Sequence, residues 1–200
     1  MRQGNNGVTG NTVKNIVFGA GTIHKNLEYT TTSGNTGSWN FTSTCVGATK
    51  GGSSFSIVPE FYSVEPDGST VAIKQFKRKV GEKATMDVNF LEITKDLIQS
   101  AVVGQSGTST DATYDLIESK DAIAEGDYWE NIAFVGETLE GKNIIVIMDN
   151  ALCTSGLSLE GRNKSEGVAK FTFECHADPA TSLTTLPYHI YYPKATTQTT

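Results

Sequence analysis

Alternation of apolar and polar residues marks the stretch from Ser53 to Val64. One parity carries Phe55, Ile57 and Phe61, and the other parity begins with serines and ends with apolar residues. A period of two places successive side chains on opposite faces of a strand. The pattern therefore predicts a β-strand here, after the glycine-rich run that begins at Gly47.

A turn and a return strand follow this segment. In Pro66-Asp67-Gly68, proline presets φ, aspartate tolerates the left-handed region and glycine supplies a positive φ, which predicts a turn. Residues from Thr70 to Lys79 alternate again. Together the two runs predict a hairpin.

Further strands are expected where short apolar or alternating runs lie between turn residues. These runs are Val13–Lys25 with a bend at Gly19–Gly21, Lys83–Ile93 with Met86, Val88 and Phe90 on one face, Tyr114–Glu118, Tyr128–Thr138, Asn143–Asp149, Ala151–Leu159, Val168–His176 and Pro187–Tyr192. The unbroken apolar run Asn143–Met148 predicts a strand that is covered on both faces.

One helix is expected after residue 94. Thr94 is a good N-cap, Asp96 lies in the first turn where the helix dipole favours an anion, and Gly104 is a natural stop. Leu97, Ile98, Ala101 and Val102 form its apolar stripe.

Polar segments rich in Gly, Ser, Thr and Asn separate or flank these elements. Residues 1–12 predict a flexible N-terminal arm, residues 195–200 a flexible tail, and Gln105–Thr113 a polar loop, while Thr30–Thr44 lacks the apolar surface to order by itself. The fold class we expect is mainly β: an antiparallel β-sandwich or open barrel with one short flanking helix, formed by a single domain over residues 13–194.

Composition narrows the function. A chain of 200 residues with 38% hydrophobic residues can form one globular core, and its net charge of −6 disfavours a protein that mainly grips nucleic acid. No uninterrupted apolar run has the ~18 residues that span a membrane. The polar N-terminus predicts no secretory signal, so we expect a protein that is made in the cytoplasm and whose three cysteines are reduced thiols.

Motifs for catalysis, metals or cofactors are weak. Cys175 and His176 are adjacent, but neighbouring strand residues point to opposite faces, so we expect a buried structural thiol instead of a nucleophile and its base. Gly19-Ala-Gly21 lacks the third glycine of a dinucleotide fingerprint, and the three histidines lack metal-ligand spacing. We expect no catalytic, metal or cofactor site and no enzyme; an enzyme that uses Cys153 or Cys175 is the remote alternative.

Charge is distributed unevenly along the chain. Residues 71–83 carry five basic residues against Glu82, a net charge of +4, and residues 111–140 carry nine acids against Lys120, a net charge of −8. The two segments are either separate solvated faces or complementary surfaces that join one copy to the next. The interface candidates are Asp67, Gly68, Lys74, Lys77, Arg78, Lys79, Lys83, Asp121, Glu125 and Asp127.

The order of these segments resembles a known family. Gly47–Glu60 (GATKGGSSFSIVPE), Glu65–Gly68 (EPDG), the lysine-rich return strand and Thr94–Ile98 (TKDLI) are similar to the major tail, or tail tube, protein of long-tailed phages and prophages of Gram-positive bacteria. The resemblance covers residues 14–193. It implies a β-sandwich with a flanking helix, in which each subunit gives about four strands to the inner barrel of a hexameric ring.

The resemblance also implies a role and partners. Stacked rings would form a hollow tube in the virion tail that passes DNA without binding it specifically, ending at tail terminator, tape measure and distal tail proteins, without membrane contact. About 24 strands spaced ~4.8 Å apart and tilted ~40° give a backbone diameter near 48 Å, which leaves a channel of roughly 35–40 Å. A duplex therefore fits only if six subunits cooperate.

Two alternatives remain open at this level. Tyr128 and Trp129 are candidates for a sugar-stacking platform in a carbohydrate-binding module of a phage baseplate or receptor-binding protein. A phage-tail-like bacteriocin would use the same tube fold in a different particle.

Overall fold

The computed structural model describes residues 7–8, 12–34, 36–161 and 163–194. It is mainly β with antiparallel sheets, as expected, and has one α-helix within the described residues. The strands are β1 (Val17–Lys25), β2 (Tyr29–Ser33), β3 (Thr36–Trp39), β4 (Thr49–Ser63), β5 (Lys77–Phe90), β6 (Gln105–Gly107), β7 (Leu116–Glu118), β8 (Trp129–Thr138), β9 (Asn143–Cys153), β10 (Ala169–Cys175) and β11 (Tyr188–Tyr191), and the helix is α1 (Lys95–Ala101). Short 3₁₀ turns cover Thr12–Asn15 and Glu125–Asp127. The arm predicted for residues 1–12 falls, apart from residues 7, 8 and 12, outside the described residues, as does the whole tail 195–200.

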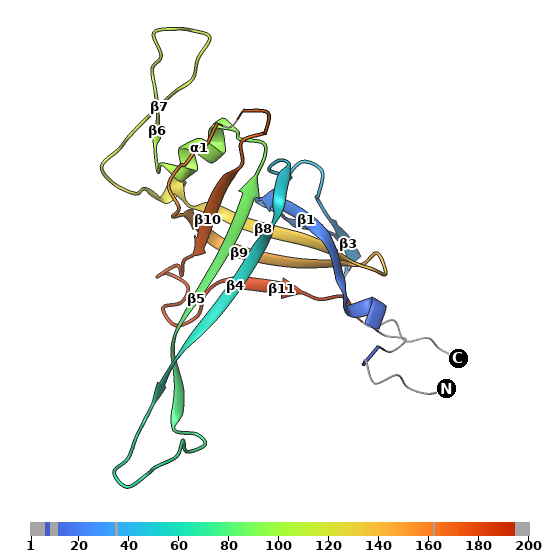
Figure 1. Ribbon diagram of the computed structural model, residues 1–200, viewed down its shortest axis with the longest axis vertical. Helices are drawn as coiled ribbons and strands as arrows, with labels where there is room; N and C mark the ends of the chain where they lie inside the picture. The colour runs from blue at the N-terminus through green and yellow to red at the C-terminus, as the bar shows by residue number, and fades with distance from the viewer. Residues whose placement is uncertain (1–6, 9–11, 35, 162, 195–200) are drawn as a thin grey trace.

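One large sheet forms the body. Its strand order is β1-β8-β9-β10-β5-β4, and β9 is shared, because residues 151–153 pair with β10 and residues 145–148 pair with β11. The two ends of this order, β1 and β4, come into contact, so the sheet curls round on itself (Figure 1). The outer edge of β1 is partly covered by the chain before β4, since the Val46 amide donates to the Ile23 carbonyl over 2.9 Å.

Apolar side chains fill the inside of this curl. Phe90, Phe171 and Phe173 are fully buried there, and Phe173 packs against Trp129 with 4.7 Å between ring centroids. The face of β5 that carries Met86, Val88 and Phe90 points into this core, as its alternation predicts. Burial of each large apolar side chain contributes about 1.5–3 kcal/mol.

A second apolar cluster lies on the opposite face of β8 and β9. Ile145 and Ile147 meet Leu27 there, and Trp39 and Phe41 from the segment around the β2–β3 hairpin pack over them. Met148, in contrast, belongs to the main core. The prediction that the apolar run at 143–148 is covered on both faces is therefore confirmed.

The helix begins as predicted but ends differently. The Thr94 hydroxyl accepts a hydrogen bond from the Leu97 amide over 3.4 Å, and the Leu97 and Ala101 side chains are buried. Val103, with φ at +48°, takes the left-handed position at the helix end that we expected of Gly104. Gly104 is required for another reason: a Cβ there would lie 2.9 Å from Cγ2 of Ile117.

Two projections leave the body at opposite ends of the long axis (Figure 1). Beyond residue 57 the β4–β5 hairpin extends away from the core, and every residue from 58 to 80 is exposed. At the other end, β6 and β7 pair in a short arm that includes the predicted loop 105–113. We call these the hairpin (residues 58–80) and the arm (residues 105–118).

Several predicted strand boundaries are wrong. The return strand begins at Lys77, not Thr70, because residues 64–76 form a loop; β5 then continues unbroken to Phe90. Gly81, which lies between the two predicted strands, pairs with Glu60 inside the ladder, and the register shift beside it leaves Val80 as the extra residue of a bulge. Likewise, the predicted strands Asn143–Asp149 and Ala151–Leu159 are one strand, β9, which ends at Cys153. Strand β1 begins at Val17 instead of Val13 and has a register shift between Phe18 and Thr22.

Candidate assembly interface

The predicted turn at the end of the hairpin is confirmed. Gly68 has φ at +84°, and the Ser69 amide donates to the Pro66 carbonyl over 3.2 Å. Asp67 is exposed beside it. The turn opens a longer loop, whose base is closed by the Val64 amide donating to the Phe76 carbonyl over 3.0 Å.

This loop encloses a hollow of about 650 Å³. Its apolar lining includes Val64, Val71 and Phe76, and Lys74 and Lys77 also line it. Val71 exposes 76% of its surface. The apolar lining is thus open to solvent in the single chain.

Apolar side chains continue along both strands of the hairpin, and the sequence analysis did not predict that they would be exposed. Phe61 and Tyr62 expose 54% and 60% of their surfaces. The full set of large exposed apolar residues on the hairpin is Val58, Phe61, Tyr62, Val64, Val71, Ile73, Phe76 and Val80. The signal was apolar residues at both parities of residues 53–64, a pattern typical of a strand covered on both faces.

The basic candidates divide into two groups. Lys74, Lys77 and Arg78 lie on the hairpin, where the Lys77 ammonium sits 4.9 Å from the centroid of the Phe61 ring. Lys79 is already paired with Glu82 over 2.7 Å, and Lys83 with Glu174 of β10 over 3.1 Å. Lys83 therefore belongs to the surface of the body instead of the hairpin.

The acidic candidates also divide. Asp121 and Glu125 are exposed, whereas Asp127 is largely covered and paired with Lys120. Burial alone would raise the pKa of Asp127, but hydrogen bonds from Lys120 and the Ala124 amide outweigh burial and lower it. Asp127 therefore stabilises its own 3₁₀ turn, and its interface role stays a prediction.

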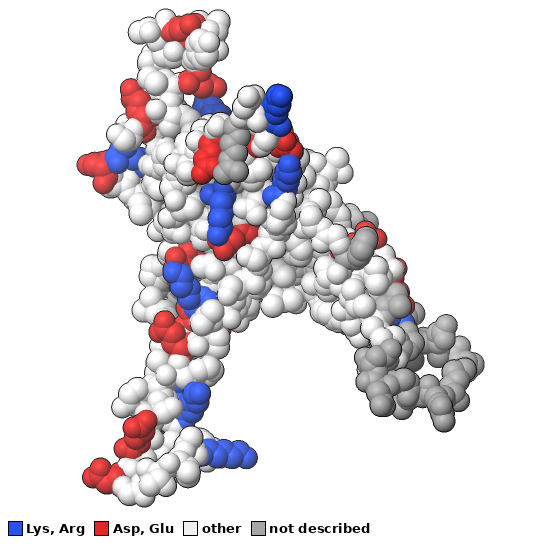
Figure 2. Space-filling model, viewed as in Figure 1, with Lys and Arg blue, Asp and Glu red and all other residues white. Residues whose placement is uncertain are grey.

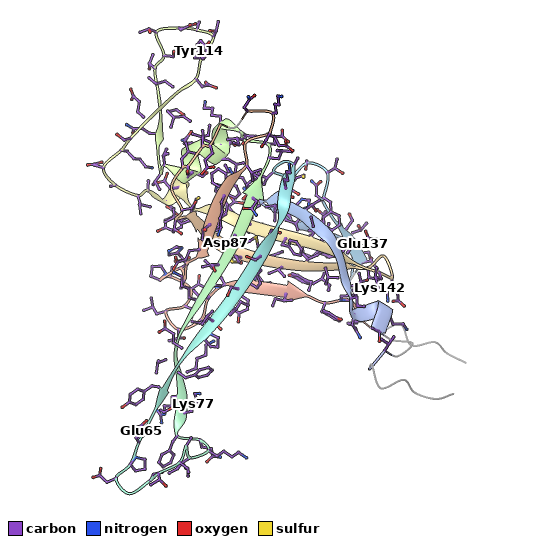
Figure 3. All side chains as sticks on the ribbon, in the orientation of Figure 1. Glu65, Lys77, Asp87, Tyr114, Glu137 and Lys142 are labelled. Carbon is purple, nitrogen blue, oxygen red and sulfur yellow. The ribbon has the colours of Figure 1, made fainter. Side chains whose placement is uncertain are left out.

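The basic residues of the hairpin and the acidic residues of the arm, Asp111, Asp115 and Glu118, lie at opposite ends of the chain (Figure 1). The return strand of the hairpin starts at one end of the molecule, and the arm with its acidic side chains forms the other end (Figure 2). Figure 3 places Lys77 and Tyr114 at these two ends. Any contact between hairpin and arm therefore requires two copies.

Cys153 and Cys175 are buried thiols. Burial raises the pKa of the Cys175 thiol to about 12, and it also raises the pKa of Cys153. The imidazole Nδ1 of His176 lies 2.9 Å from the carbonyl oxygen of Glu174, and its ring packs against Tyr128. Among the described residues, no cluster of His, Cys, Asp or Glu could hold a metal ion, and no helix is long and apolar enough to cross a membrane.

His24 is buried among hydroxyl groups. Its Nε2 lies 2.8 Å from the Thr22 hydroxyl and its Nδ1 lies 3.0 Å from the Thr44 hydroxyl. The Thr44 hydroxyl donates its hydrogen bond to the Asn40 carbonyl, so it can only accept from His24. The Nδ1 of His24 therefore donates to Thr44, and its Nε2 accepts from the Thr22 hydroxyl. Burial lowers the pKa of His24, which favours the neutral ring.

The proposed sugar platform is not exposed. Trp129 exposes only 4% of its surface, its Nε1 donates to the Ser100 hydroxyl over 2.9 Å, and the Lys25 ammonium lies 4.7 Å from the ring centroid. Its ring is therefore covered and engaged within the body.

The sequence matches no protein-family model and no curated protein.

Proposed function

We propose that this chain is a structural subunit that assembles with identical copies into stacked hexameric rings, which form the hollow tail tube of a phage. The proposal combines the sequence resemblance with one structural observation. A long hairpin projects from a well-packed body and leaves eight large apolar side chains uncovered. Exposed apolar surface of this extent marks an interaction site, and a partner covers it in the working particle.

Unpaired strand edges support assembly between copies. Among the described strands, β4 pairs only with β5 and β11 pairs only with β9, so each presents one edge without a strand partner. An exposed edge is a template for another chain, and closing strands into a ring removes the edges. A ring of six copies would thus complete the sheets that a single chain leaves open.

The charge of the chain suits a conduit. With a net charge of −6, a tube built of this protein is acidic, and carboxylates that face a lumen repel phosphate instead of exchanging counterions with it. DNA would then pass without being held. The expected partners are further copies of the chain along the tube and the terminator, tape measure and distal tail proteins at its ends, in the virion.

The carbohydrate-binding alternative loses its main support because Trp129 is buried. Replacing Trp129 with alanine is expected to destabilise the body. An effect confined to glycan binding, with the fold intact, would instead favour the alternative.

Electron microscopy of concentrated purified protein tests the proposal. The wild-type chain is expected to form uniform hollow fibres. Reversal of Lys77, Arg78 and Lys79 to Glu is expected to leave folded monomer that does not extend into tubes.

A matched control carries the same change in net charge away from the hairpin. Reversal of Lys164, Lys170 and Lys194 to Glu is expected to leave fibres unchanged, since these exposed lysines lie away from the hairpin and exposed ion pairs such as Lys170 with Asp87 contribute little. Normal tubes from the hairpin variant would refute a charge-dependent contact at the hairpin. A wild-type chain that remains monomeric and binds a ligand would refute the tube.

A further inference from the structure

The tip of the arm presents a single exposed aromatic side chain. The Tyr114 amide donates to the Asp111 carbonyl over 3.1 Å, which closes a turn at the tip. The Asp111 carboxylate accepts hydrogen bonds from the Thr113 amide and hydroxyl over 2.9 and 2.7 Å. Tyr114 stands outside this braced turn with 71% of its surface exposed, at the end of the molecule opposite Lys77 (Figure 3).

We propose that Tyr114 of one copy docks into the hairpin hollow of the next copy along the long axis. The inference rests on the proposed function and specifies its axial contact. The hollow of about 650 Å³ is in the size range that takes a compact ligand, and an aromatic anchor in a pocket is the typical hot spot of a protein interface. Because the turn at the tip is already formed in the single chain, little ordering is required on docking.

Charge selects the orientation of the contact. Asp111 and Asp115 flank Tyr114, and Lys74 and Lys77 line the hollow on the limb of the loop that returns to β5. Asp115 has a partner, Lys95 at 3.0 Å, but this pair is exposed and weak enough to be shared. The arm therefore meets opposite charge on the returning limb.

The other limb of the loop disfavours a different orientation. Glu65 and Asp67 lie on the limb that arrives from β4, and they would repel the acidic arm. Attraction on one limb and repulsion on the other fix a single register. Tyr114 and the hollow lie at opposite ends of one chain, so the contact joins two different surfaces. Each copy can therefore bind a further copy at its other end, and the repeated contact builds a filament.

Disulfide cross-linking tests the contact without requiring tubes. The full-length chain carries Cys45→Ser, which removes its exposed native thiol. Because Cys153 and Cys175 are buried, the introduced cysteines are then the exposed thiols. Ala112→Cys, in the same turn as Tyr114, and Val71→Cys, on the hollow, are made in separate proteins, mixed at high protein concentration and oxidised. We expect a mixed dimer. A control that carries Leu183→Cys, which is 80% exposed outside the hollow, in place of Val71→Cys should give at least about tenfold less.

Growth measurements separate this contact from the tube itself. Tyr114→Ala is expected to raise the protein concentration needed for tube growth by about 30-fold or more, and Tyr114→Phe by less than about threefold, because the ring is kept. The docking proposal is overturned if Tyr114→Ala forms tubes as readily as the wild type, or if the mixed dimer does not exceed the control. In either case the proposed tube stands if the wild-type chain forms tubes. If the mixed dimer forms and no tube is ever seen, the docking stands and the proposed function fails.

Discussion

Phe61 and Phe171 offer a matched test of the idea that the hairpin is completed by other copies. Phe61 exposes 54% of its surface, so truncation to alanine removes only about half of the ~1.5–3 kcal/mol that full burial of a phenylalanine gives. The lost contact with the Lys77 ammonium adds about 0.5–1 kcal/mol. Together these losses predict that Phe61→Ala lowers the free energy of unfolding of the dilute monomer by about 1.2–2.5 kcal/mol.

Phe171 undergoes the same chemical change in a different setting. Its side chain is fully buried and packs against Phe90 with 5.6 Å between ring centroids. Phe171→Ala should therefore lower the free energy of unfolding by about 3–5 kcal/mol. Urea titration of dilute protein, followed by tryptophan fluorescence, measures both values.

In assembly, among chains that remain folded, Phe61→Ala should have a larger effect than Phe171→Ala, the reverse of their order in stability. Phe61→Ala is expected to raise the concentration needed for tube growth by about 30-fold or more, since an aromatic side chain is lost from the interface. Two results would refute the reasoning: a loss of 3 kcal/mol or more in the Phe61→Ala monomer, or tube growth equal to wild type.

Three further predictions follow from the body of the protein. Thr94→Ala should lower the free energy of unfolding by about 1 kcal/mol in urea titrations, because the helix N-cap is lost, whereas Thr94→Ser should be nearly neutral. Burial lowers the pKa of His24 below its ordinary 6.5, so the unfolded chain gains a proton first as the pH falls. The free energy of unfolding should therefore be full well above pH 6.5 and should decline as the pH falls through 6.5. His24→Gln should flatten this decline between about pH 7.5 and 5.5, and an unchanged slope would contradict the assignment. Exposed Cys45 should react with a thiol reagent in the native protein while Cys153 and Cys175 react only after unfolding, as counted by mass spectrometry; rapid native labelling of Cys175 would contradict its raised pKa.

Local patterns were sufficient for much of the fold. The Thr94 cap and the core-facing side of β5 depend on neighbours within a few residues, and both are confirmed. The ends of β5 were wrong because pairing with the 15-residue strand β4 decides them, and this pairing holds Gly81 inside the ladder beside a bulge. Val71 and Ile73 alternate as strand residues do, yet they have no strand partner and lie in a loop.

The charge of the candidate interface could be proposed from the sequence, but its shape could not. Lys74 and Lys77 were named as candidates because basic residues cluster in the sequence, and their interface role stays a prediction, whereas the covering of Asp127 by Lys120 depends on a turn that composition does not reveal. Sequence also gave no sign that Tyr114 would stand at the end of an arm, because exposure depends on what the rest of the chain leaves uncovered.

Hydrogen–deuterium exchange of the dilute chain and of the concentrated, assembled chain tests the central claim most directly. The account predicts that peptides from residues 58–80 and 105–118 exchange rapidly in the dilute chain and become strongly protected on assembly, while the core peptides of β9 and β10 change little. Hairpin peptides that exchange equally fast in both samples would contradict it.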